Sequence, residues 1–182
     1  MNRHTGVVGL AGVLTLVLAA CGSGTPEGKP SASAPSSLMP SASLAPSAAA
    51  GRDALVAYRG MWAAFVEAGK TSDADAPDLR KYASGNALKL IVSSLYTNRD
   101  QGKVSKGALM LDPKVTELKP SEAPTEATIL DCVDSTNWLE YKASGELWDD
   151  KPGGKHRTTA TVTRTDGSWT VSSFVLEGAA TC

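Results

Sequence analysis

The hydrophobic periodicity of this chain changes once, near Gly102, and that change is what most restricts its fold. Between residues 53 and 101, apolar side chains recur every three or four positions, the spacing of one face of an α-helix. After Gly102 they alternate with polar residues, which is typical of half-buried strands. Helices followed by strands predict an α+β fold with the helices packed on one face of an antiparallel sheet.

The helical part divides into three segments. The first runs from Asp53 to Ala68 and ends at Gly69, a residue type that often ends helices. A short helix opens at residues 75–78, where proline and acidic residues suit a first turn, and it is interrupted at residues 84–85. The third runs from about Asn86 to Gln101. The stripe expected to face the core of the first helix is Leu55, Tyr58, Trp62 and Phe65.

The strand part has a proline that predicts strong curvature. Pro113 has no N–H for a sheet ladder, so a long strand over Val104–Lys119 must bend or bulge at Asp112-Pro113. The other expected strands are Thr125–Val133, Trp138–Ala143, Lys155–Thr165 and Ser168–Leu176.

Asp166-Gly167 predicts a tight hairpin between the last two strands. With these residues as the loop, Val162 lies opposite Val171 and Ala160 lies opposite Ser173. The face toward the core is then expected to contain Ala160, Val162, Val171 and Val175.

The first 20 residues have the features of a secretory signal peptide. Arg3 precedes an apolar run of about 14 residues, shorter than the roughly 20 needed to span a bilayer. Leu18-Ala19-Ala20-Cys21 resembles the lipobox of bacterial lipoproteins. That resemblance implies cleavage before Cys21, a lipid on its thiol, and attachment to the outer face of the cell membrane. An uncleaved anchor helix, or an ordinary signal peptide with a chance cysteine, are the alternatives.

Composition divides the rest of the chain at about residue 50. Residues 21–50 contain the lipid-bearing cysteine and a Ser, Ala and Pro-rich segment with few large side chains, which predicts a disordered tether. Residues 51–182 form one domain of ordinary size. Without residues 1–20 the chain has 17 basic and 19 acidic residues, so its charge gives no reason to expect nucleic acid as a partner.

Two cysteines remain when Cys21 carries the lipid. Outside the cytosol, Cys132 and Cys182 are expected to form a disulfide that pins the C-terminus to a central strand. A redox-active pair is the alternative, but the chain has no Cys-x-x-Cys motif.

The domain resembles the NTF2-like α+β cone, and more narrowly the small actinobacterial lipoproteins of unknown function that carry such a domain. Besides the lipobox and the tether, four segments carry the resemblance: 131–135 (DCVDS), 152–154 (PGG), Lys155-His156 and 166–169 (DGSW). The resemblance implies helices on a strongly curved antiparallel sheet. Relatives with this fold include isomerases, cyclases, dehydratases and binding domains, so the fold does not select an activity.

Asp131 is the most unusual polar residue of the expected core. Alternation places its carboxylate on the helix-covered face, where an apolar pocket would raise its pKa and let it move a proton. Pairing with a basic residue, or capping a turn, is the alternative. Tyr58, Trp62 and Tyr96, with Tyr82, are candidates to line that pocket or else belong to the core.

Other catalytic and cofactor sites have little basis in the sequence. His156 is the only histidine after the leader and is expected at the surface, which leaves hydrolytic triads without a base. No metal-ligand spacing, phosphate loop or dinucleotide motif is present, so no metal and no cofactor is expected.

Three functional hypotheses follow. The first is a membrane-tethered, non-catalytic module that binds a small apolar ligand or an envelope protein. The second is an isomerase- or cyclase-type enzyme with Asp131 as general base. The third is an accessory part of a larger envelope assembly.

Overall fold

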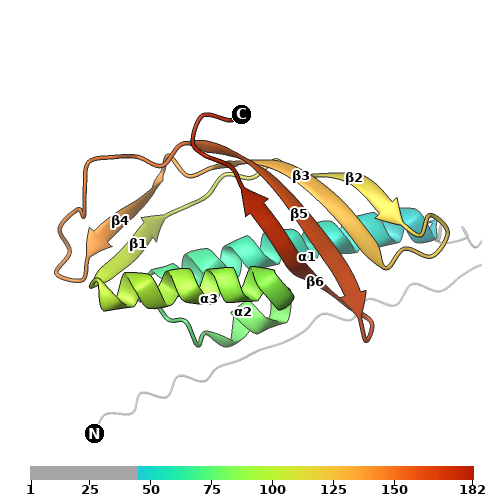
Figure 1. Ribbon diagram of the computed structural model, residues 1–182, viewed down its shortest axis with the longest axis horizontal. Helices are drawn as coiled ribbons and strands as arrows, with labels where there is room; N and C mark the ends of the chain where they lie inside the picture. Colours follow the sequence, from blue (N-terminus) through green and yellow to red (C-terminus); the bar gives the residue numbers. More distant parts are fainter. Residues whose placement is uncertain (1–44) are drawn as a thin grey trace, which may run out of the picture. The chain divides into compact units, whose positions relative to one another are not determined.

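The computed structural model describes residues 45–182, which form three helices followed by six strands (Figure 1). The predicted leader, Cys21 and most of the tether lie outside the described residues. The helices are α1 (Pro46–Gly69), α2 (Pro77–Tyr82) and α3 (Gly85–Asp100). The strands are β1 (Lys103–Gly107), β2 (Lys114–Lys119), β3 (Glu126–Asp134), β4 (Trp138–Lys142), β5 (Lys155–Thr165) and β6 (Ser168–Leu176).

Helix α1 begins earlier than the hydrophobic stripe predicts. It includes residues 46–50, which composition assigned to the tether. Pro46 occupies the first turn, where its fixed φ favours a helix and its missing N–H costs nothing. Three alanines then continue the helix, and Ala50 is already buried.

Gly60 lets α2 pack closely on α1. A Cβ at this position would lie 2.5 Å from the nearest carbon of the Tyr82 ring. The absence of a side chain therefore brings the two helices together, at the usual helix-propensity cost of about 1 kcal/mol relative to alanine.

The strands form a four-stranded antiparallel sheet in the order β2-β3-β5-β6 and a two-stranded ribbon of β1 and β4. The long strand predicted over residues 104–119 is therefore two strands that belong to different sheets. A bridge between Met110 and Asp134 connects the interrupted segment to the end of β3. The predicted break at Asp112-Pro113 is present, since β2 begins directly after Pro113.

The predicted α+β class is confirmed. Figure 1 shows the strands arching over α1 and α3, which is the arrangement expected of an NTF2-like cone. The alternation of β3 is also confirmed, because Ala127, Ile129, Asp131 and Val133 are all buried on the helix-covered side. The surrounding apolar side chains form one core cluster.

The predicted register of the β5–β6 hairpin is correct near the turn and wrong farther from it. Val162 lies opposite Val171 as predicted, but Ala160 lies opposite Phe174 instead of Ser173. A bulge at Ser172, whose hydroxyl donates to the Thr161 carbonyl at 3.1 Å, adds one residue to β6. The prediction that Val175 faces the core is therefore wrong: Val175 is 65% exposed, and Phe174 turns inward.

The chain end is fastened to the sheet by the predicted disulfide between Cys132 and Cys182, which is present in the structure. Cys132 lies on the internal strand β3. Backbone hydrogen bonds from Glu177 to Arg157 and from Thr181 to Lys155 hold the intervening tail along the start of β5. Residues 177–182 therefore form a strap across one end of the sheet.

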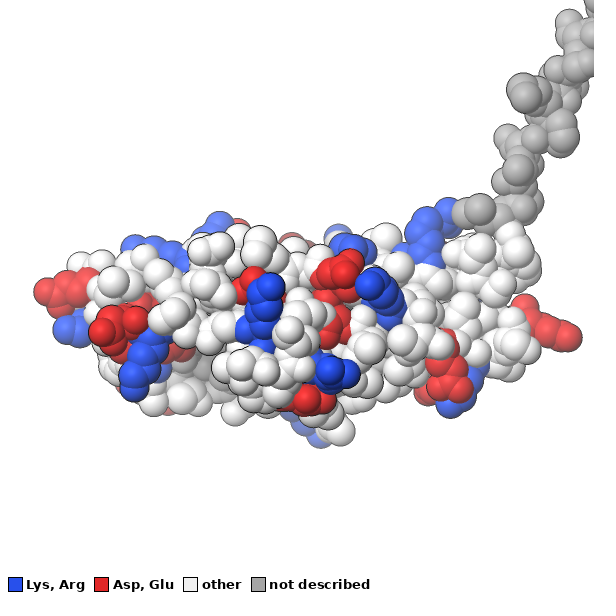
Figure 2. All heavy atoms as spheres, turned by 90° about the horizontal axis from the view of Figure 1, so that it is seen from above, with Lys and Arg blue, Asp and Glu red and all other residues white. Residues whose placement is uncertain are grey.

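The surface charges are mixed. Figure 2 shows basic and acidic side chains interspersed over the face seen from above, with no large area of one sign. This agrees with the formal net charge of −1 for the whole chain. Among residues 45–182, no helix combines the length and the hydropathy needed to cross a bilayer.

Candidate ligand-binding site

A cavity of about 700 Å³ lies between α1, α3 and the strands. Small-molecule sites are typically 300–1,000 Å³ and mostly apolar, so its size falls within that range. The apolar lining comes from both helices, three strands and the segment before β2: Trp62, Phe65, Leu90, Ile91, Leu109, Val133, Trp138, Phe174, Val175 and Leu176.

Aromatic rings form much of the cavity wall. The Trp62 and Phe174 ring centroids are 5.4 Å apart, and those of Phe65 and Trp138 are 5.1 Å apart. Trp62 and Phe65 also contact edge to face, at 6.1 Å. Such pairs add about 0.5–1.5 kcal/mol beyond the burial of area, so they hold this wall in one arrangement.

The mouth of the cavity is apolar and exposed. Leu90 on α3 is 51% exposed, and Val175 and Leu176 at the end of β6 are 65% and 44% exposed, yet all three line the cavity. Adjacent exposed apolar side chains on a protein surface often mark a binding site.

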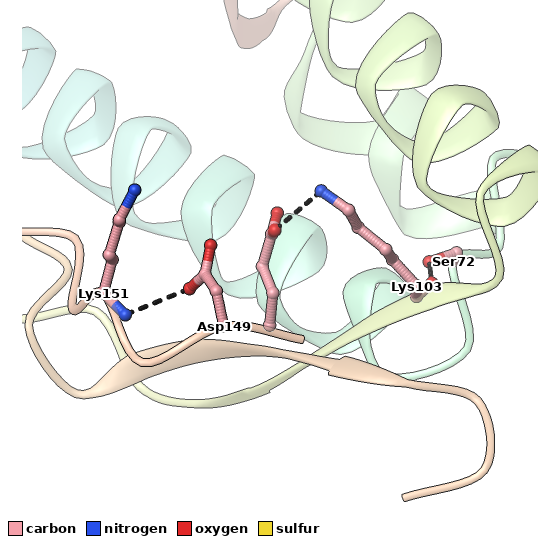
Figure 3. Close-up of polar contacts among 5 residues, drawn as sticks. Ser72, Lys103, Asp149 and Lys151 are labelled. Carbon is pink, nitrogen blue, oxygen red and sulfur yellow. Dashed lines mark hydrogen bonds and ion pairs between the residues drawn. The ribbon is translucent and has the colours of Figure 1, made fainter. Parts of the chain in front are cut away.

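The other part of the lining is polar and comes from β4 and the loop before β5. The Glu140 carboxylate accepts a hydrogen bond from the Lys103 ammonium, with Nζ and Oε2 2.8 Å apart. This ion pair neutralises the charge of Glu140. The Asp149 carboxylate accepts a hydrogen bond from the backbone N–H of Lys151 at 3.1 Å. Figure 3 shows the side chains of Asp149 and Lys151 extending from this loop toward the helices.

His156 lines the cavity and is only half-buried, whereas the sequence indicated a surface position. Its Nδ1 lies 2.9 Å from the Glu177 carbonyl, so this nitrogen carries the proton. Its Nε2 lies 3.3 Å from the Ser135 hydroxyl. The C-terminal strap therefore fixes the orientation of a ring in the cavity wall.

Asp131 is buried on the helix-covered face, as predicted, but it does not line the cavity. Its Oδ2 accepts from the Tyr58 hydroxyl at 3.0 Å, and its Oδ1 accepts from the backbone N–H of Asp112 at 2.7 Å. It borders a separate hollow of about 190 Å³, beside the disulfide. Both carboxylate oxygens are thus engaged by the protein, away from the large cavity.

Tyr58 is the buried partner of that carboxylate. Burial, and then the neighbouring Asp131 charge, raises the pKa of Tyr58 far above its usual value. Among residues 45–182, the Trp62 indole N–H has no hydrogen-bond partner. Tyr58 therefore remains protonated and acts as a hydrogen-bond donor.

Replacing Tyr58 by Phe is expected to lower the free energy of unfolding by about 1–3 kcal/mol, because the buried Asp131 oxygen loses its donor. Urea unfolding followed by circular dichroism measures the change. Tyr96→Phe is the matched control, since Tyr96 is exposed, and should change stability by less than about 0.5 kcal/mol. Equal stability of the two variants would show that the Tyr58–Asp131 bond contributes nothing.

Of the four predicted pocket residues, only Trp62 lines the large cavity. Tyr96 lies on the last turns of α3 and is 38% exposed, with the Arg99 guanidinium carbon 4.5 Å from its ring centroid. Tyr82 packs against Gly60 and does not reach the cavity. The pocket is therefore made by aromatics of α1, β4 and β6 and not by the tyrosines.

Asp134 stabilises the turn that carries Ser135 to the cavity. Hydrogen bonds from the Thr136 hydroxyl and the Thr136 backbone N–H lower the pKa of its carboxyl. A lowered pKa favours folding above the unfolded value near 3.8, and this stabilisation is lost as the pH falls through the folded-state pKa.

The Asp134→Asn variant is therefore expected to be less stable than the natural chain at pH 7, and the difference should shrink as the pH falls below about 4. Chemical unfolding at a series of pH values measures it. Asp100→Asn, at the exposed end of α3, serves as the control. A stability difference that stays constant down to pH 2 would contradict this role of the Asp134 charge.

Within residues 45–182 there is no cluster of three or more His, Cys, Asp or Glu side chains arranged to hold a metal ion. The polar side of the cavity instead has acidic and basic side chains that come from β4 and the loop before β5.

No family model matches the chain, and no curated protein matches it. Several solved structures are similar in fold. One is the intermembrane-space region of the chloroplast protein ARC6, at 14% identity and a TM-score of 0.43, covering 71% of this chain and 97% of that one.

Two other similar structures come from bacteria. A protein of unknown function with a cystatin-like fold from Nostoc punctiforme has 12% identity and a TM-score of 0.43, covering 70% of this chain and 92% of that one. A candidate scytalone dehydratase from Novosphingobium aromaticivorans has 16% identity and a TM-score of 0.38, covering 70% and 87%. None of these similarities assigns an activity, a ligand or a partner.

Sequence reasoning missed most of the cavity wall. Strict alternation predicts Val175 on the core face instead of Phe174, because the sequence pattern does not reveal the bulge between them and the turn. Trp138 and Phe65 meet only when α1 packs against β4, a contact between segments 73 residues apart. The aromatic character of these residues was the signal available in the sequence, but no local pattern indicated which residues they would contact.

Proposed function

We propose that this chain is a lipoprotein, anchored through Cys21 to the outer face of the cell membrane, whose α+β domain binds a small apolar ligand without transforming it. The cavity is the observation that supports the binding role. Its volume suits a small molecule, its walls are aromatic and aliphatic, and its mouth is open and apolar.

The location rests on the lipobox-like Leu18-Ala19-Ala20-Cys21. A diacylated cysteine supplies two chains, which is sufficient for stable attachment to a bilayer. The Ser, Ala and Pro-rich residues between Cys21 and α1 would then hold the domain at the membrane surface.

A non-catalytic role is favoured because the predicted general base does not line the cavity. The base candidate Asp131 is bonded to Tyr58 and to the Asp112 backbone, outside the lining. The isomerase or cyclase alternative therefore has no specific observation in its favour.

Titration with N-phenylnaphthylamine, a neutral probe that becomes fluorescent in apolar surroundings, tests the binding role. The full chain is used with Cys21→Ser, so that no detergent is needed. Binding should be weakened about tenfold by Ser94→Phe, because overfilling a packed space costs about 1–3 kcal/mol. Ser93→Phe, on the exposed neighbouring position of α3, is the control and should bind normally. Absence of probe binding, or equal binding by both variants, would refute the cavity as the site.

Cell fractionation tests the anchor separately. The natural chain should be recovered with membranes, and Cys21→Ser should be released from them. Membrane retention of the Cys21→Ser chain would refute the lipid anchor and leave the binding role of the domain to be judged by the titration alone.

A further inference from the structure

The cavity contains two opposite charges that the described residues leave uncompensated. Lys151 lines the cavity but takes part in none of the ion pairs found among residues 45–182. Asp149 also lines it and has a backbone N–H as its partner, without a cation. Although these residues are two positions apart, their side-chain charges are not within ion-pair distance of each other.

The third charged side chain of the lining and its histidine already have partners within the protein. Glu140 is paired with Lys103, which approaches it from outside the lining. His156 has the Glu177 carbonyl at one nitrogen and the Ser135 hydroxyl at the other. Among residues 45–182, the charged side chains of the lining without an ion-pair partner are therefore Asp149 and Lys151, both exposed on the loop before β5.

The apolar part of the site lies next to these charges and is open to solvent at Leu90, Val175 and Leu176. A ligand that satisfies both parts has an apolar chain, buried against Trp62 and Phe174, and a head that carries both signs of charge. A purely anionic head would pair with Lys151 and lie near the like charge of Asp149. A purely cationic head would pair with Asp149 and lie near the like charge of Lys151.

We propose that the ligand is a zwitterionic single-chain amphiphile, with its anionic group at Lys151 and its ammonium group at Asp149. This inference rests on the proposed function, because it specifies the ligand class of the same cavity. The apolar tail supplies most of the affinity, and the two charges of the loop select the head.

Four amphiphiles with the same acyl or alkyl chain serve as probes below their micelle-forming concentrations. They are a lysophosphatidylethanolamine, a fatty acid, an alkyltrimethylammonium and a monoacylglycerol. Each is titrated into the full Cys21→Ser chain by isothermal calorimetry, and its displacement of N-phenylnaphthylamine gives a second readout. The zwitterion is expected to bind tightest.

Charge-removing variants then assign the two ends of the head. Lys151→Gln should weaken the zwitterion and the fatty acid about two- to fivefold, the size expected of an exposed charge pair, and should leave the cationic probe no weaker. Asp149→Asn should weaken the zwitterion and the cationic probe by a similar factor. The neutral monoacylglycerol should bind equally to both variants and the natural chain.

Asp112 and Lys114 provide the control, because they are an aspartate and a lysine two residues apart that do not line the cavity; unlike Asp149 and Lys151, they form an ion pair with each other. Asp112→Asn and Lys114→Gln should change none of the four affinities. Equal affinities for all four heads, or equal effects of the cavity and control variants, would overturn the head assignment while leaving the apolar site intact. Failure of N-phenylnaphthylamine itself to bind would instead refute the proposed function.

Discussion

Replacing Cys132 and Cys182 together by serine is expected to lower the free energy of unfolding by about 4 kcal/mol. The disulfide closes a loop of 50 residues, and the chain-entropy model gives this value for a crosslink of that length. It also joins the C-terminal strap to β3, so its loss releases Thr181 from Arg157 and Glu177 from His156.

Urea unfolding measures the effect on the Cys21→Ser chain, compared with the same chain in which Cys132 and Cys182 are also serine. Neither protein then has a free thiol. The variant should also bind N-phenylnaphthylamine more weakly, because the strap holds His156 in the cavity wall. An unfolding free energy within 1 kcal/mol of that of the parent chain would contradict the assigned role of the crosslink.

Trp62→Ala is expected to cost about 3–5 kcal/mol of stability, the usual loss for a buried tryptophan. Trp62 is only 4% exposed and contacts the rings of Tyr58, Phe65 and Phe174. Its removal separates α1 from β6 at the cavity wall. Thermal and urea unfolding should both register the loss.

Val56→Ala is the control on the same helix. Val56 is 60% exposed, and its truncation should change stability by less than about 0.5 kcal/mol. Similar effects of the two substitutions would show that Trp62 does not hold the helix to the sheet.

The fold follows from local patterns to a large extent. The helical stripe of Tyr58, Trp62 and Phe65 and the alternation along β3 each place a buried face correctly, and the turn at Asp166-Gly167 does so as far as Val171. These patterns succeed because they reflect backbone periods of 3.6 and 2 residues, which do not depend on distant parts of the chain.

Features that depend on tertiary contacts were missed. The bulge at Ser172 reverses the faces of Phe174 and Val175, and a one-residue shift of this kind carries no mark in composition. Likewise, the start of α1 at Pro46 depends on residues that look like tether until Ala50 packs against the domain.

In the candidate site, too, local patterns predict some features and tertiary contacts decide the others. The burial of Asp131 follows from alternation, but its isolation from the cavity depends on two hydrogen bonds, from Tyr58 and from the Asp112 backbone. The charges at Asp149 and Lys151 lie in a loop without periodicity, so only the folded chain brings them to the cavity.

Contact quenching by a bromine-labelled acyl chain tests the central claim most directly, because it locates the ligand. Trp62 and Trp138 line the cavity, whereas Trp148 and Trp169 do not. In the full Cys21→Ser chain, a variant that retains only Trp62 and Trp138 should lose most of its fluorescence when the brominated amphiphile binds. The reciprocal variant retains only Trp148 and Trp169, and phenylalanine replaces Trp62 and Trp138 so that the cavity wall keeps its aromatic rings. It should still bind the amphiphile by calorimetry and lose little fluorescence; strong quenching there, with none at Trp62 and Trp138, would contradict the cavity as the binding site.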